Sequence, residues 1–213
     1  MIDDLIAPIG DFLAGACHGT QVQAWSNKMG GEGGKLLAEA LKAHPNYEQI
    51  AQNMFNGEAK VNISNKGLDA GDAWIMGAAL EKNDTVTEVE ASDCGMGTAG
   101  AKAFGDVLRV NKTLQHLNVS NNSFGKVQKG DQVKLKSSGK MKTVTRTDDD
   151  GEIKVEGGSD GVKPSEFEWE SHVPAFCAGL AASSSLLSVS DSLWCSGRLL
   201  RPFCCVGEYI FFT

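Results

Sequence analysis

The chain lacks the features that direct a protein into or across a membrane. It has no run of about 18 apolar residues, so no transmembrane helix is expected. The first residues, Met1-Ile2-Asp3-Asp4, carry acids where a secretory signal has bases. None of the six cysteines forms a CxxC pair, and their spacings match no zinc pattern. We therefore expect a cytoplasmic protein with reduced thiols, no metal site and no membrane partner.

An excess of basic charge is also missing. The chain has 20 Lys and Arg residues against 27 Asp and Glu residues, which gives a formal net charge of −7. An acidic chain is a poor default ligand for nucleic acid, because phosphate binding needs positive charge. Nucleic acid is therefore not the expected partner.

Motifs for catalysis are absent as well. The sequence contains no GxSxG, HExxH or phosphate-loop motif. The glycine-rich residues 30–34 lack the Lys-Ser/Thr of a phosphate loop, and we interpret them as a loop leading into a helix. The aspartates at 148–150 do not form a calcium loop, because its first and last positions would be Arg146 and Gly157. We expect no enzyme and no cofactor.

What the sequence does contain is an internal repeat. Residues 114–124, LQHLNVSNNSF, fit the pattern LxxLxLxxNxL, with Val and Phe in place of two leucines. The apolar positions recur one 28-residue period earlier at 86–96 and again at 58–68, where only Glu58 departs from the pattern. Between these segments, apolar residues spaced by three and four predict helices. Each unit is therefore a strand, a turn and a helix.

Stacking explains why such units recur, since one strand and one helix cannot bury their apolar faces alone. We predict a parallel sheet with helices on its outer side. Its interior would be formed by Val61, Ile63, Val89, Ala91, Leu117 and Val119. The ninth position of the pattern, occupied by Cys94 and Asn122, would bind turn backbone as a structural ladder; Lys66 does not fit this role.

The period of 28, the Asn or Cys at the ladder position and the helix motif Gly97-Thr-Ala-Gly100-Ala101-Lys-Ala103-Phe104 resemble ribonuclease-inhibitor-type leucine-rich repeats. The resemblance covers residues 60–125. It implies an α/β fold, a short leucine-rich-repeat solenoid. It also implies a scaffold that binds proteins on its concave face without chemistry of its own.

Flanking segments extend the pattern. Residues 34–41 resemble the repeat helices, and residues 45–57 are then too long for the period, which suggests an N-terminal cap with an insertion. Residues 173–186 align with 101–114 at an offset of 72. The strand expected to follow them fails in the pattern, because Asp191 falls where Val119 lies and no ladder Asn follows.

Residues 124–169 alternate polar and apolar side chains, with turn signals between short segments. Asp-Gly between β-branched segments is a strong hairpin signal. We predict a small antiparallel β-barrel insert, and Lys129-Gly130-Asp131-Gln-Val133 resembles the first strand of Src-homology-3-like or KOW-like barrels. Its lysines leave open an alternative function, in which the insert binds a peptide or nucleic acid.

The predicted organisation has five parts. They are an N-terminal segment (1–33), repeats with their cap (34–125), the insert (126–170), a partial further repeat (171–189) and an atypical apolar tail (190–213). The tail is aromatic and cysteine-rich, unlike a polar solenoid cap. It comes either from truncation or a shifted reading frame, or it is a strap over the end of the sheet.

Partner binding is expected on the strand residues that alternate outward from the sheet. The register of the repeat arranges them in three rows: Lys60, Glu88 and His116; Asn62, Glu90 and Asn118; and Ser64, Ser92 and Ser120. These rows would form a concave polar patch with a mildly acidic centre that binds a protein partner. A role as a regulator of a small GTPase, known for some relatives of this repeat class, is a further alternative.

Overall fold

The computed structural model describes residues 22, 24–148, 151–158 and 160–190. The expectations for the apolar tail and for most of the N-terminal segment therefore concern residues outside the described ones. None of the helices described is both long enough and apolar enough to cross a membrane.

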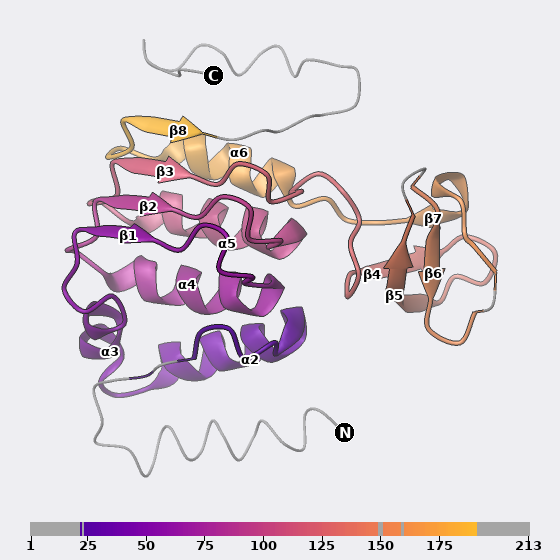
Figure 1. Ribbon diagram of the computed structural model, residues 1–213, viewed down its shortest axis with the longest axis horizontal. Helices are drawn as coiled ribbons and strands as arrows, with labels where there is room; N and C mark the ends of the chain where they lie inside the picture. The colour runs from indigo at the N-terminus through magenta and orange to yellow at the C-terminus, as the bar shows by residue number, and fades with distance from the viewer. Residues whose placement is uncertain (1–21, 23, 149–150, 159, 191–213) are drawn as a thin grey trace.

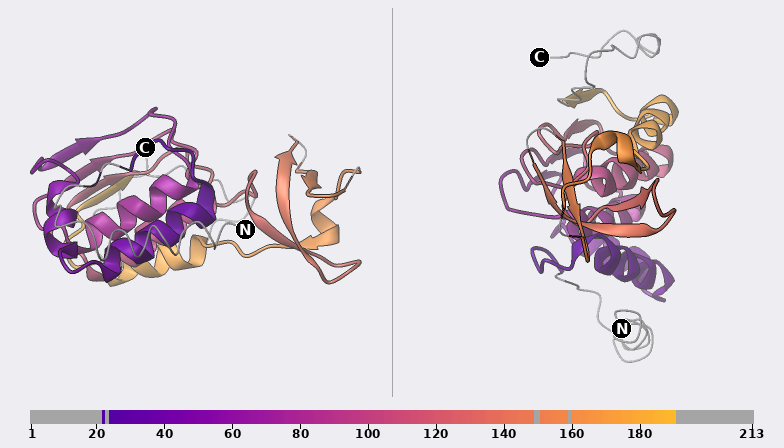
Figure 2. Two further views of the ribbon diagram at one scale, coloured as in Figure 1. Left: turned by 90° about the horizontal axis from the view of Figure 1, so that it is seen from below. Right: turned by 90° about the vertical axis from the view of Figure 1, so that its right-hand side faces the viewer.

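A parallel four-stranded sheet and a layer of helices make up the larger part of the molecule, which we call the array (Figure 1). The sheet has the order β1-β2-β3-β8, and helices α2, α4, α5 and α6 pack side by side on one face (Figure 2). The strands are β1 (Lys60–Asn62), β2 (Glu88–Glu90), β3 (His116–Asn118) and β8 (Ser188–Ser190). The helices are α2 (Gly30–Ala43), α3 (Tyr47–Asn53), α4 (Ala70–Lys82), α5 (Gly97–Val110) and α6 (Val173–Ala182).

The predicted register is confirmed. Val61 pairs with Val89, and Val89 pairs with Leu117, so each strand lies beside the equivalent strand of the next repeat. Val89, Ala91, Leu117 and Val119 are buried in one continuous apolar core between sheet and helices. Val61 and Ile63 are only half-buried, because β1 is the edge strand of the sheet.

Small residues let the helices approach closely. A Cβ added to Gly105 of α5 would lie 2.5 Å from the carbonyl oxygen of Ala175 in α6, and one added to Gly179 would lie 2.2 Å from that of Gly105. Side chains at either position would therefore push α5 and α6 apart. The edge-on contact of Phe124 and Phe176, with ring centroids 5.3 Å apart, closes the same seam.

Two sequence expectations about the array need correction. The glycine-rich residues 30–34 form the first turns of α2 rather than a loop. The strand that was expected to fail does form, since Val189 of β8 pairs with Leu117 of β3. Backbone bonds from Leu187 and Ser188 to the Gln115 carbonyl carry this pairing, so one inward valine suffices without the rest of the motif.

The chain makes the same turn after each strand of the repeat, with two residues at positive φ. These pairs are Asn65 and Gly67, Asp93 and Gly95, and Asn121 and Ser123. Ser26 and Lys28 form an earlier pair of the same kind, at a longer spacing from Asn65 and Gly67 than one repeat period. An additional copy of the turn thus precedes α2, and α3 with its connections accounts for the longer spacing.

The insert is an antiparallel sheet that curls into a half-barrel, not a closed barrel. Its strand order is β6-β5-β4-β7, and its own apolar core contains Val133, Val144, Ile153, Val155 and Phe167. The strands are β4 (Gln132–Leu135), β5 (Met141–Thr147), β6 (Ile153–Val155) and β7 (Phe167–Glu168), with a 3-10 turn, η1, at Pro164–Glu166. Figure 1 shows the half-barrel beyond the ends toward which the strands of the array point.

Asp131 joins the half-barrel to the array. Its Oδ1 accepts a hydrogen bond from Thr98 Oγ1 of α5 at 3.1 Å, and its Oδ2 accepts one from the Gln128 amide at 2.9 Å. Burial raises the pKa of Asp131, and these hydrogen bonds act against that effect. The junction therefore holds a partly desolvated carboxyl group.

Candidate partner-binding face

The first predicted row lies across the helix-free face of the sheet, and the structure adds Ser188 to it. Lys60, Glu88, His116 and Ser188 are neighbours in adjacent strands. Lys60 Nζ lies 2.7 Å from Glu88 Oε2, and His116 Nδ1 lies 2.7 Å from Ser188 Oγ. The hydrogen bond to Glu88 raises the pKa of Lys60. Each side chain of this row is thus held by a neighbour.

The second row contains Asn62, Glu90 and Asn118, paired in the same register. Asn118 Nδ2 donates to Glu90 Oε2 at 2.6 Å, and Asn118 Oδ1 accepts from the Ser120 amide at 3.1 Å. Asn62 Oδ1 accepts from the Ser64 amide at 3.1 Å in the same way. The asparagines therefore fix the backbone just beyond the strands, and Asn118 also orients Glu90.

The third row continues this arrangement at the carboxyl ends of the strands. The Ser92 amide donates to Ser64 Oγ at 3.1 Å, and Ser64, Ser92 and Ser120 are all half-buried. The structure thus brings all nine predicted binding residues onto one surface. We call this surface the strand face. It offers two carboxylates in its centre, each already bound to one neighbour, with hydroxyl and amide groups around them.

Cys94 and Asn122 lie behind this face and bind turn backbone. Asn122 Nδ2 donates to the carbonyls of Ala91 at 2.7 Å and Val119 at 2.9 Å, while its Oδ1 accepts from the Cys94 amide at 3.2 Å. Cys94 Sγ lies 3.1 Å from the Ile63 carbonyl oxygen, and burial raises the pKa of this thiol. Both side chains have the ladder geometry that the sequence predicted.

A second ladder at the other ends of the strands was missed. Asn111 Nδ2 donates to the carbonyls of Leu80 at 2.7 Å and Asn83 at 3.0 Å. Asn83 Nδ2 donates in turn to the Ala51 carbonyl at 3.1 Å. The signal was present, since Asn83 and Asn111 align in the repeat after matching leucines.

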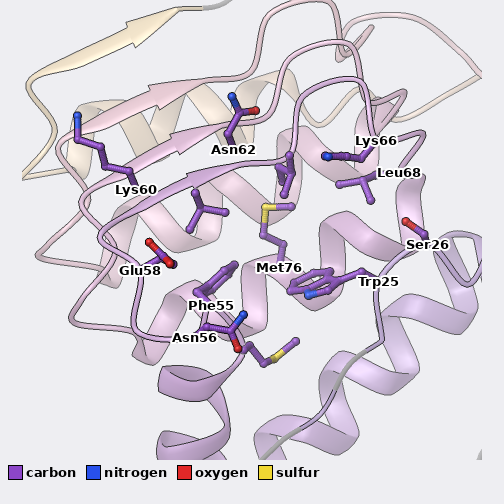
Figure 3. A pocket seen from close by; sticks show the side chains of 13 residues that line it. Trp25, Ser26, Phe55, Asn56, Glu58, Lys60, Asn62, Lys66, Leu68 and Met76 are labelled. Atoms are coloured by element: carbon purple, nitrogen blue, oxygen red, sulfur yellow. The ribbon is translucent and has the colours of Figure 1, made fainter.

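A cavity of about 370 Å³ beside β1 was also missed. Its walls include Trp25 and Phe55, whose ring centroids are 5.8 Å apart, together with Val61, Ile63 and Met76 (Figure 3). It exists because the chain before α2 does not pair with β1 among the described residues. Sequence periodicity alone carries no sign of such a gap.

The half-barrel's basic side chains are partly engaged in local contacts. Lys136 Nζ donates to the Ser165 carbonyl at 2.9 Å, and Lys142 Nζ donates to the Glu156 carbonyl at 3.0 Å. Arg146 Nε lies 2.7 Å from Asp148 Oδ1. These contacts reduce the number of cations that could meet phosphates in a regular line.

The histidine of the strand face, His116, contacts a hydroxyl group. His116 and Ser188 form a contact through Nδ1, but the neighbouring carboxylate, Glu88, is bound by Lys60. Within the described ranges, no group of three or more His, Cys, Asp or Glu side chains could hold a metal ion. The strand face can supply hydrogen-bond donors and acceptors to a partner.

The comparisons with known proteins add no relative. No protein-family model matches the chain, and neither the curated proteins nor the solved structures yield a match.

Proposed function

We propose that the chain is a non-catalytic, leucine-rich-repeat interaction module that binds a protein partner on the strand face. The register that aligns nine polar side chains in three rows carries this proposal. Among the described residues, helices lie only on the opposite face of the sheet, which supports access of a partner to the rows (Figure 2). Pre-ordered side chains lose less conformational freedom on binding, which favours recognition over an unstructured polar surface.

The strand face favours a partner with hydrogen-bonding and basic groups. Glu88 and Glu90 lie on β2, the second of the four strands; Lys60 and His116 flank Glu88, and Asn62 and Asn118 flank Glu90. The face is small, so binding depends on a few central contacts rather than on area. Cys94 is not part of a disulfide, which suits the reducing cytoplasm where we place the protein.

Reversing the central charges tests this proposal. We expect Glu88→Lys with Glu90→Lys to reduce recovery of specific partners from a cytosolic extract by about tenfold or more, equivalent to about 1.4 kcal/mol. The matched control is Glu39→Lys with Glu170→Lys, which changes the net charge equally at two exposed positions outside the strand face. Quantitative mass spectrometry of affinity-purified full-length chains measures the recovery.

Circular dichroism and the unfolding midpoint verify that both variants remain folded. If the two variants recover the same proteins in the same amounts as the natural chain, the strand face is not the binding surface.

A further inference from the structure

The cavity beside β1 follows the open edge of the sheet. Its lining includes Val61 and Ile63, which point toward the core, and Lys60 and Asn62, which point toward the strand face. A cavity that touches both sides of a strand must run along that strand's edge. We call it the edge slot; Trp25 and Phe55 form its opposite wall (Figure 3).

The backbone along the slot has hydrogen-bonding groups directed away from β2. The Ile63 and Asn65 amides donate to the carbonyls of Glu90 and Ser92, and the Ala59 carbonyl accepts from the Thr87 amide. Odd-numbered residues therefore bond to β2. Because successive residues of a strand direct their backbone groups to opposite sides, Lys60 and Asn62 present theirs to the slot. Within the described ranges, β1 has no second strand beside it.

The inner side of the slot is apolar and incompletely covered. Val61 and Ile63 are half-buried, whereas their counterparts Val89 and Ala91 are fully buried because a strand lies on each side of them. Met54, Leu68 and Met76 complete the apolar lining. Two apolar side chains from a further strand would cover the position that the array leaves open.

Charged groups occur only at the ends and rim of the slot. Figure 3 shows Glu58 and Lys66 at opposite ends, with Lys66 beyond the carboxyl end of β1. Lys28 Nζ, which donates to the Gly67 carbonyl, adds a second cation near the Lys66 end. Lys60 also lies at the start of β1, but its Nζ is paired with Glu88, so Glu58 gives this end an acidic group, whereas Lys66 and Lys28 make the other end basic.

We propose that the edge slot binds an extended peptide segment of a partner protein as an additional parallel strand. The segment carries aliphatic residues at positions i and i+2, which enter the slot beside Val61 and Ile63. A basic residue precedes them near Glu58, and acidic residues follow them near Lys66 and Lys28. This site does not depend on the strand face, although Lys60 and Asn62 border both.

Synthetic peptides added to the isotope-labelled full-length chain test the proposal by NMR. The probe is acetyl-KQVQLSEE-amide, whose Val and Leu alternate with polar residues. We expect saturable shifts of the Lys60 and Asn62 amides and of the Trp25 indole. Two controls share its composition or pattern: acetyl-KQQVLSEE-amide makes the apolar residues adjacent, and acetyl-EQVQLSKK-amide reverses the charges. Both should bind at least about threefold more weakly.

Asn62→Pro and Asn62→Ala form a matched pair of variants. Both lose the side-chain bond to the Ser64 amide, but only proline also removes the backbone donor that faces the slot. We expect Asn62→Pro to weaken peptide binding about fivefold or more relative to Asn62→Ala, as the loss of one hydrogen bond implies. Unshifted β2 and β3 resonances verify that the sheet persists.

If Asn62→Pro does not fold, Val61→Phe provides the second test, because the larger ring fills the slot and should abolish binding. Equal binding of all three peptides, binding unaffected by either variant, or no saturable shift with any peptide would overturn the proposal. Partner recovery from an extract tests the strand face, whereas the peptide titration tests the edge slot, so a failure of one and a failure of the other are distinguishable.

Discussion

The array and the half-barrel use opposite ways of building a sheet. In the array, short parallel strands are joined through helices, and each repeat strand lies beside its copy from the next unit. In the half-barrel, antiparallel strands are joined by short turns and surround five buried side chains. The array extends by adding units, whereas the half-barrel is complete in itself. The repeated part therefore tolerates an insertion within one unit, between the turn after β3 and the helix α6.

The position of the half-barrel supports this difference. Leu117 pairs with Val189 in the register of the other strands, although the whole half-barrel lies between them in the chain. Phe124 and Phe176, on either side of the insertion, keep the turn after β3 in contact with α6. Thr98 and Asp131 then link the inserted sheet to α5.

The largest loss of stability should come from truncating one buried side chain in each core separately. Leu117 in the array and Ile153 in the half-barrel are both almost fully buried, in different apolar clusters. Truncating either to alanine should cost about 2–5 kcal/mol of local stability. Hydrogen exchange in a urea series should locate the loss for Leu117→Ala in the array and for Ile153→Ala in the half-barrel. Equal losses in both parts would mean that they unfold as one unit.

A smaller loss of stability should follow from removing Asn122, a ladder residue of the array. Asn122→Ala leaves the Ala91 and Val119 carbonyls without this donor and should cost about 1–3 kcal/mol. Lys66→Ala changes an exposed residue at the equivalent position of the first unit and should stay within about 0.5 kcal/mol. Chemical unfolding midpoints measure both values. Similar losses for the two variants would contradict the structural role of the ladder.

The stability of the folded chain should depend on pH through Asp131, at the junction of the half-barrel and the array. Burial raises the pKa of Asp131, so the folded chain holds this proton more tightly than the unfolded chain. Ionisation of Asp131 then lowers stability as the pH rises above about 3.9, the ordinary value for Asp. We expect acidification toward that value to stabilise the natural chain relative to Asp131→Asn. Thermal midpoints of both proteins across the acidic range measure this, and parallel curves would contradict it.

Deleting the half-barrel should have the smallest effect on the fold of the array and on its recovery of partners. Removing residues 127–170 gives Leu117 and Val189 the same separation along the chain as Val89 and Leu117. Because the half-barrel has its own core, the array should remain folded and should recover the same partners in affinity purification. A folded deletion variant that loses those partners would instead assign binding to the half-barrel.

Much of the array could be predicted because its information is local and repeated. The period of the repeat located three strands, the helices between them and the nine residues of the strand face. The turn at Ser26 and Lys28 escaped notice because α3 lengthens the spacing beyond one period. The strand β8 was missed because the pattern was judged at Asp191, whereas β8 already ends at Ser190.

The amino-acid sequence by itself determined the repeating unit, since apolar side chains at a fixed period can be buried only when copies lie next to each other. It also determined the alternating strands of the insert, which follow from polar and apolar residues in turn. Only the tertiary structure decided that the insert curls into a half-barrel and that, among the described residues, an apolar slot lies along β1. Both depend on how segments far apart in the chain meet, and the chain's local pattern contains no record of distances between them.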